Sequence, residues 1–275
     1  MGTALKSILK DIFRIQPLPR VSLEVQELAS REGTDPAEIC QRLESEPALC
    51  ARVLQLANSP VYGFVREIST LEEAGNLLGN RCLANLALTS AAARCFRGGS
   101  GSSAARRQAA WERALQTAIV ARLVAALTKH ADPSRSYTAA LLCDLGSLAM
   151  IEHFPVESVH LEPLDADPER CLERERELFG MTHAEAGGIL LERWKMPDAL
   201  VECARRHHAP DQARLQPEVS RVTHLACELT TRLRGQDADT PLQLNGKELD
   251  GPLLARLQEQ YAAEWTKAQS LLTLR

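Results

Sequence analysis

Residues 139–146 read Ala-Ala-Leu-Leu-Cys-Asp-Leu-Gly, an apolar run that ends on a cysteine, an aspartate, a leucine and a glycine. The run predicts a helix from about Ser136 through the Cys143-Asp144 pair. Helix signals recur on both sides of it, while alternating runs of β-branched or aromatic residues are nearly absent. The sequence of 275 residues is therefore expected to form an all-α protein.

Capping residues and prolines predict the boundaries of the other helices. N-terminal capping patterns occur at Asp35-Pro36-Ala37-Glu38, at Thr70 with Glu73, and at Thr182 with Glu185. Helices are expected at 36–43, 47–57, 71–78, 83–91, 107–129 and 136–144, from 168, from 183, at 198–206 and 217–233, and after 252. The segment 236–251 is expected to be a loop.

One stretch, Arg97–Ser103, has the glycine- and serine-rich composition of a flexible linker. It falls where the helical pattern pauses, so we expect two lobes, 1–97 and 105–275, joined by a linker at 98–104. The predicted architecture is a two-lobed helical bundle, and the second lobe includes a C-terminal helix.

Composition excludes some classes of partner. The net charge of −4 and a pI near 6.0 argue against a nucleic-acid-binding surface, which is normally basic. The longest apolar stretch, 118–127, contains Arg122 and falls short of the roughly 18 residues that cross a bilayer. No stretch resembles a signal peptide, so we expect a cytoplasmic protein without a membrane partner. The eight cysteines are scattered, which predicts buried thiols instead of disulfides or zinc ligands.

Motifs along both halves of the chain, taken in order, resemble the HDOD domain, a helical relative of the HD metal-dependent phosphohydrolases found in bacterial signalling proteins. In the first half they are Leu18-Pro19, 46–49, 53–59, Tyr62-Gly63, 68–71 and Leu78-Gly79. In the second half they are 139–146, Glu177, Phe179-Gly180, His183, Gly187, Leu190, Trp194, Pro197 and His207-His208. The resemblance covers about residues 12 to 235 and implies an HDOD lobe packed on an HD-like lobe.

The resemblance also implies where HD metal ligands would stand. Arg113 falls where the first histidine is expected, Cys143 replaces the second, Asp144 remains, and Cys227 replaces the final aspartate. An HD hydrolase needs its imidazole and carboxylate ligands to hold the ion that activates water. These four positions are thus expected to be a vestigial site, without metal or other cofactor. A thiolate–imidazole zinc site made by Cys143, Cys227 and His183 is the alternative.

Three histidines survive at positions that help to hold a second ion in two-metal relatives: His183, His207 and His208. Neighbouring residues on a helix point about 100° apart, so we expect at most one of His207 and His208 to face Asp144. A structural interpretation is open for each: His183 begins a capped helix, and the other two lie at a basic helix end.

A residual ligand or anion site is also predicted from the positive charges near these histidines. Arg205 and Arg206 precede His207-His208, and together with Arg113 they could attract a small anion or a nucleotide. Asp144 is expected to be a buried carboxylate paired with Arg113.

The sequence therefore predicts a non-catalytic signal-transduction module of HDOD type that binds another signalling protein. The alternative is a divergent metal-dependent phosphohydrolase or cyclic-dinucleotide phosphodiesterase that uses Asp144, His183 and His207 or His208. A third possibility is a nucleotide-binding sensor without turnover. The partner and the oligomeric state stay open.

Overall fold

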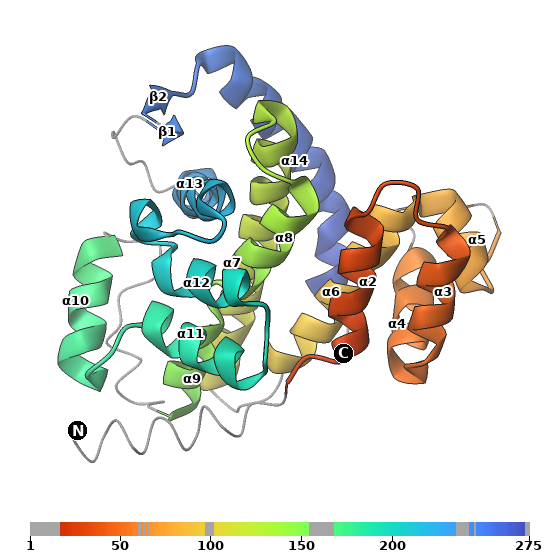
Figure 1. Cartoon of the computed structure of the whole chain (residues 1–275), viewed down its shortest axis with the longest axis horizontal. Coiled ribbons are helices and arrows are strands. Elements are labelled where there is room, and N and C mark those ends of the chain that lie inside the picture. Colours follow the sequence, from red (N-terminus) through yellow and green to blue (C-terminus); the bar gives the residue numbers. More distant parts are fainter. Residues whose placement is uncertain are drawn as a thin grey trace. The chain divides into compact units, whose positions relative to one another are not determined.

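The computed structural model describes residues 17–59, 62, 64, 66–96, 102–153, 168–234, 242–244 and 246–272. The all-α prediction is confirmed, because helices account for nearly all regular structure in these ranges (Figure 1). The chain divides into two compact units, of which one comprises Pro17–Cys95 and Ala262–Arg275 and the other Met1–Gln16 and Phe96–Tyr261.

The smaller unit is built from short amphipathic helices that share one apolar core. They are α2 (Arg20–Ser30), α3 (Pro36–Glu44), α4 (Pro47–Ala57), α5 (Leu71–Leu78) and α6 (Asn80–Phe96). The predicted caps are present: the side chain of Asp35 accepts the Ala37 amide, and Thr70 accepts the Glu73 amide. Asn58, at the end of α4, exchanges two hydrogen bonds with the backbone of Ile68 and so fixes the chain between α4 and α5.

The larger unit carries the candidate site. Its elements are α7 (Ser102–Thr128), α8 (Pro133–Leu142), α9 (Leu145–His153), α10 (Pro168–Phe179), α11 (His183–Arg193), α12 (Asp198–Arg206), the 3-10 turn η3 (Pro210–Gln212), α13 (Pro217–Leu233), β1 (Gln243–Leu244), β2 (Lys247–Glu248) and α14 (Gly251–Leu272). The long α7 packs against α8 and α13, and α11 packs against α9 and α12 (Figure 1). α7 is buried along much of its length, and the buried residues include polar ones such as Arg113.

A close crossing of α9 and α11 fixes the position of the site. A Cβ atom on Gly146 would lie 1.9 Å from the backbone oxygen of His183 and 2.4 Å from the backbone nitrogen of Gly187. Only a glycine allows this approach, and it brings the N-terminus of α11 directly onto the turn between α8 and α9. Gly187 lies at the same contact, where a Cβ atom on it would be 3.3 Å from the backbone nitrogen of Gly146.

Several boundaries differ from expectation. Cys143 and Asp144 form a turn after α8 instead of ending the helix, and 102–104, expected in the linker, begin α7. The rest of the expected linker, 98–101, lies outside the described residues. The segment expected to be a loop includes a two-residue antiparallel pairing of β1 with β2. The end of α14, from Ala262, belongs to the smaller unit, whereas we expected the whole helix in the second lobe.

Candidate functional site

Five elements of the larger unit direct side chains toward the turn between α8 and α9. α7 contributes Arg113, the turn itself contributes Cys143 and Asp144, α11 begins with His183, His207 and His208 follow α12, and α13 contributes Cys227. The capping box of Thr182 and Glu185, confirmed as predicted, starts α11 at this point. Residues that are distant in the sequence therefore meet at one buried cluster.

Arg113 and Asp144 form a buried ion pair. Nη1 of Arg113 lies 3.5 Å from Oδ2 of Asp144, and the two side chains are 7% and 4% exposed. Burial alone would raise the pKa of Asp144, but the charge of Arg113 and the hydrogen bond and charge of His207 hold it well below its usual range. Asp144 is therefore a carboxylate at neutral pH.

The other oxygen of Asp144 faces two histidines. Oδ1 lies 3.3 Å from Nε2 of His207 and 3.5 Å from Nε2 of His183. The carboxylate thus has a guanidinium at one oxygen and imidazoles at the other. All three partners are almost fully buried.

His183 is held by a carboxylate that the sequence analysis did not single out. Glu175, on α10 and 2% exposed, accepts hydrogen bonds from Nδ1 of His183 at 2.8 Å and from its backbone nitrogen at 2.8 Å. Burial lowers the pKa of His183, but the charge and hydrogen bond of Glu175, together with the charge of Asp144, outweigh it and raise the pKa overall. The signal for Glu175 lay in helical spacing, since it falls on the same buried face as Cys171 and Phe179.

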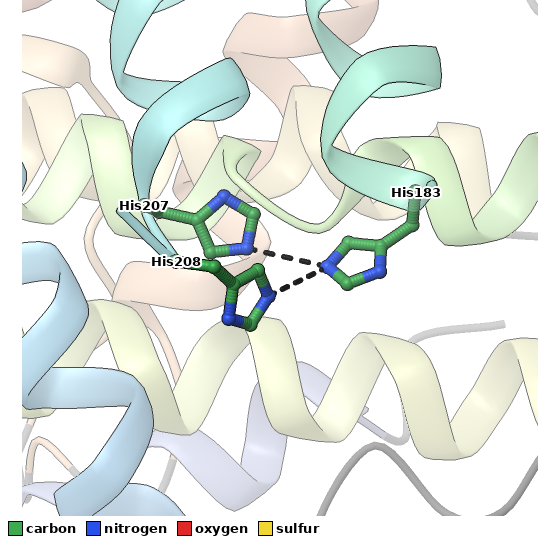
Figure 2. Close-up of side chains that lie close together, drawn as sticks. All are labelled: His183, His207 and His208. Carbon is green, nitrogen blue, oxygen red and sulfur yellow. Dashed lines mark hydrogen bonds between the residues drawn. The ribbon is translucent and has the colours of Figure 1, made fainter. Parts of the chain in front are cut away.

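His207 and His208 both turn toward His183, and of the two His207 lies beside Asp144. Nε2 of His183 lies 3.3 Å from Nε2 of His207 and 3.0 Å from Nε2 of His208 (Figure 2). α12 ends at Arg206, and His208 lies in the turn beyond it, where the 100° spacing of a helix no longer applies.

The backbone around α12 fixes the orientation of His207. Its Nδ1 donates a hydrogen bond to the carbonyl oxygen of Ala204 at 2.7 Å. Nδ1 of His224, on α13, donates to the carbonyl oxygen of His207 at 2.7 Å. His208 is half-buried, and burial together with the neighbouring imidazoles lowers its pKa far below the usual value. His208 is therefore neutral at physiological pH.

Two buried thiols complete the cluster on its α13 side. The hydrogen bond with Cys227, together with burial, raises the pKa of Cys143 well above its ordinary value, so this group is a neutral thiol at pH 7. Sγ of Cys143 also donates to the carbonyl oxygen of Ala140 at 3.2 Å. The ligand atoms of Cys143, Asp144 and His207 all lie within 4.8 Å of one another, as do those of the three histidines.

The two arginines expected in an anion site with the histidines lie at the surface instead. Arg205 pairs with Glu192 at 2.7 Å, and Arg206 donates to Gln212 at 2.6 Å. Both are partly or fully exposed, whereas His207 is buried. The structure brings the histidines together with Asp144 and Arg113 but not with Arg205 and Arg206.

A helical body in which an aspartate at an interhelical turn meets histidines from the following helices defines the class of HD-type helical proteins. Within this class the chain belongs to the HDOD domain family, whose pattern matches residues 15–210. The resemblance noted in the sequence is thereby confirmed.

Known proteins with a similar sequence or fold include several of the same class. An uncharacterized protein of Treponema pallidum (strain Nichols) is 27% identical over 245 residues, which is 86% of this chain and 45% of that protein, so the chain spans less than half of its relative. An HDOD domain protein with unknown function from Geobacter sulfurreducens superposes with a TM-score of 0.66 at 23% identity, over 98% of this chain and 96% of that one.

Two further solved structures share the fold. A candidate phosphohydrolase from Shewanella amazonensis SB2B gives a TM-score of 0.70 at 22% identity over 98% of this chain and 100% of that chain. A candidate signal transduction protein from Marinobacter aquaeolei VT8 gives 0.69 at 21% identity over 98% of this chain and 63% of that chain. Among the described helices, none combines the length and apolarity needed to cross a bilayer.

Proposed function

We propose that the protein is a non-catalytic signalling module that acts by binding another signalling protein. The observation that carries this proposal is the ion pair between Arg113 and Asp144, buried inside the cluster. A guanidinium is a permanent cation, so it takes the position beside the carboxylate that a catalytic metal ion needs. The shared fold of a candidate signal transduction protein is consistent with a signalling role.

Burial supports the same proposal. His183, His207 and Asp144 are 1%, 0% and 3% exposed, so a phosphodiester substrate has little access to them. Cys143 adds a neutral thiol where hydrolysis would require a group that holds a cation or activates water. These features favour a structural role for the cluster, with recognition carried by the surface of the protein.

A second candidate function, a metal-dependent phosphohydrolase or cyclic-dinucleotide phosphodiesterase, is favoured by one observation. The imidazoles of His183, His207 and His208 converge, and Asp144 lies beside two of them, as ligands of a catalytic ion would. The shared fold of a candidate phosphohydrolase is in line with this alternative.

Turnover assays distinguish the two functions. Purified full-length protein is incubated with bis-p-nitrophenyl phosphate and with cyclic dinucleotides, in the presence of Mn²⁺ or Mg²⁺. We expect no hydrolysis above the rate of the Asp144→Ala variant. Hydrolysis by the original protein that Asp144→Ala abolishes would establish the enzyme. A nucleotide that raises the melting temperature without being hydrolysed would instead indicate a sensor.

Binding to another signalling protein is tested with purified proteins. Proteins that the chain captures from cells of its source organism are each expressed and purified, and their affinity for the chain is measured by calorimetry. We expect one signalling protein to bind with 1:1 stoichiometry, and equally well to the Asp144→Ala variant if that variant folds. If none of the purified candidates binds, the proposed role in binding a signalling protein is wrong.

A further inference from the structure

Cys143 and Cys227 form a pair of thiols inside the larger unit. Cys143 lies in the turn between α8 and α9, Cys227 lies on α13, and the two side chains share a hydrogen bond. Both cysteines are free, and they are 0% and 6% exposed. The fold therefore brings two sulfur atoms that are distant in the sequence into hydrogen-bond contact.

The surroundings of this pair differ from those of a thiol that only fills the core. Cys203, a third buried thiol nearby, belongs to an apolar cluster and donates to the hydroxyl of Thr223 at 3.6 Å. Cys227 instead lies close to the guanidinium of Arg113, whose charge acts on it against that of Asp144. A neighbouring arginine favours the thiolate, which is the form of cysteine that reacts with oxidants.

Two cysteines of the smaller unit, Cys40 and Cys50, provide a comparison. Burial and the nearby carboxylate of Glu44 raise the pKa of both thiols. Cys50 is more exposed than either member of the buried pair. Because carboxylates keep these two thiols protonated, we expect them to react more slowly with an oxidant in spite of that exposure.

The backbone around Cys143 indicates which element would move if the two sulfurs were joined. A Cβ atom on Gly187 would lie 3.4 Å from the carbonyl oxygen of Cys143. One on Gly146 would lie 1.9 Å from the backbone oxygen of His183. These close backbone contacts hold the turn against α11. A shift that draws the sulfurs together would therefore fall on α13, which carries Cys227.

We propose that Cys143 and Cys227 are a redox-sensitive pair that peroxide converts into a disulfide. The O–O bond of peroxide breaks as one thiol becomes a sulfenic acid, and the other oxygen leaves as water. The second sulfur then attacks the sulfenic sulfur, so that an S–S bond forms, the S–O bond breaks and a second water leaves. The two waters carry away both thiol protons, and peroxide is the oxidant that is reduced.

Burial restricts this reaction to an oxidant as small as hydrogen peroxide, because both side chains are almost fully covered. The inference does not depend on the proposed function. The disulfide would tie the turn between α8 and α9 to α13 by a covalent bond, whether or not the surface of the protein binds a partner.

Mass spectrometry of the full-length protein tests the proposal. Folded protein is treated with hydrogen peroxide, the remaining thiols are alkylated, and the protein is digested without reductant. We expect a cross-linked pair of peptides that contains Cys143 and Cys227, and an intact mass lower by about 2 Da. Dithiothreitol should restore both free thiols.

The variant Cys227→Ser is expected to lose the cross-link, whereas the control Cys203→Ser should form it in unchanged yield. Circular dichroism verifies that each variant is folded, and Cys143→Ser replaces Cys227→Ser if that variant unfolds. The peptide map of the original protein needs no variant. The proposal is overturned if peroxide leaves Cys143 and Cys227 as free thiols or sulfinic acids, or if Cys40 and Cys50 are linked first. Hydrolysis and partner binding do not enter these measurements, so the two proposals fail separately.

Discussion

The two oxygens of Asp144 face two chemically different halves of one cluster. Arg113 lies on the Oδ2 side, and the thiols of Cys143 and Cys227 lie close to the same carboxylate. On the Oδ1 side lie two imidazoles, His183 and His207. The first side carries a permanent positive charge, whereas the second carries groups that can gain or lose a proton.

This difference means that the two sides of Asp144 can be tested separately. The positive charge of Arg113 is part of the chain and stays beside the carboxylate under all conditions. On the other side, Nδ1 of His183 and Nδ1 of His207 are each held by another group, Glu175 and the Ala204 carbonyl. The predictions below separate the two halves.

The largest effect is expected for Arg113→Met. Removing the guanidinium leaves Asp144 as a buried carboxylate that has lost its strongest partner, which costs about 3–5 kcal/mol of the free energy of unfolding. Urea denaturation of metal-free protein measures this. The double variant Arg113→Met with Asp144→Asn is the control and should recover much of the loss, because no charge is then left unpaired. Equal destabilisation in the two variants would show that Arg113 acts by packing.

A smaller loss, about 1–3 kcal/mol, is expected for Gly146→Ala. The added methyl would lie 1.9 Å from the His183 backbone oxygen and would force α9 and α11 apart. Urea denaturation measures the loss.

Gly188→Ala, on the facing helix α11, is the control. Its methyl would lie 2.2 Å from Cγ of Arg205, so the Arg205 side chain must move, whereas alanine is favoured over glycine inside a helix by about 1 kcal/mol. We expect a smaller loss than for Gly146→Ala, because a partly exposed side chain yields more easily than a backbone. A loss equal to that of Gly146→Ala would mean that the crossing tolerates separation.

Helix boundaries were largely predictable because their signals are local. α12 and α13 begin and end at the residues expected from their prolines and apolar spacing, and Thr182 starts α11 as predicted. The pairing of Arg113 with Asp144 was also predicted, because the family resemblance places both residues at the same site.

Features that depend on tertiary geometry were not predictable. His207 and His208 converge because both lie in the turn after α12, and the conformation of that turn depends on packing that leaves little trace in the sequence. Glu175 stands in a run of alternating charges, which is typical of a solvated surface. Only its alignment with Cys171 and Phe179 on one face indicated that this carboxylate is buried.

Glu175→Gln tests how strongly the histidine half depends on its anchor. The amide keeps the size of the side chain but loses the charge that holds Nδ1 of His183. We expect a loss of about 1–2 kcal/mol of the free energy of unfolding, because a hydrogen bond to a charged group is replaced by a weaker neutral one. Glu177→Gln is the control, since this side chain is 66% exposed on the same helix. Equal stability of the two variants would show that Glu175 does not hold His183.

The smallest effect is expected for Cys227→Ser. Cys227 and Cys143 share a hydrogen bond close to Asp144. Weakening this contact is expected to cost about 1 kcal/mol of the free energy of unfolding, which urea denaturation measures. Unchanged stability in Cys227→Ser would show that the thiol pair contributes nothing to holding this side of the cluster, and that Arg113 and the histidines fix Asp144 alone.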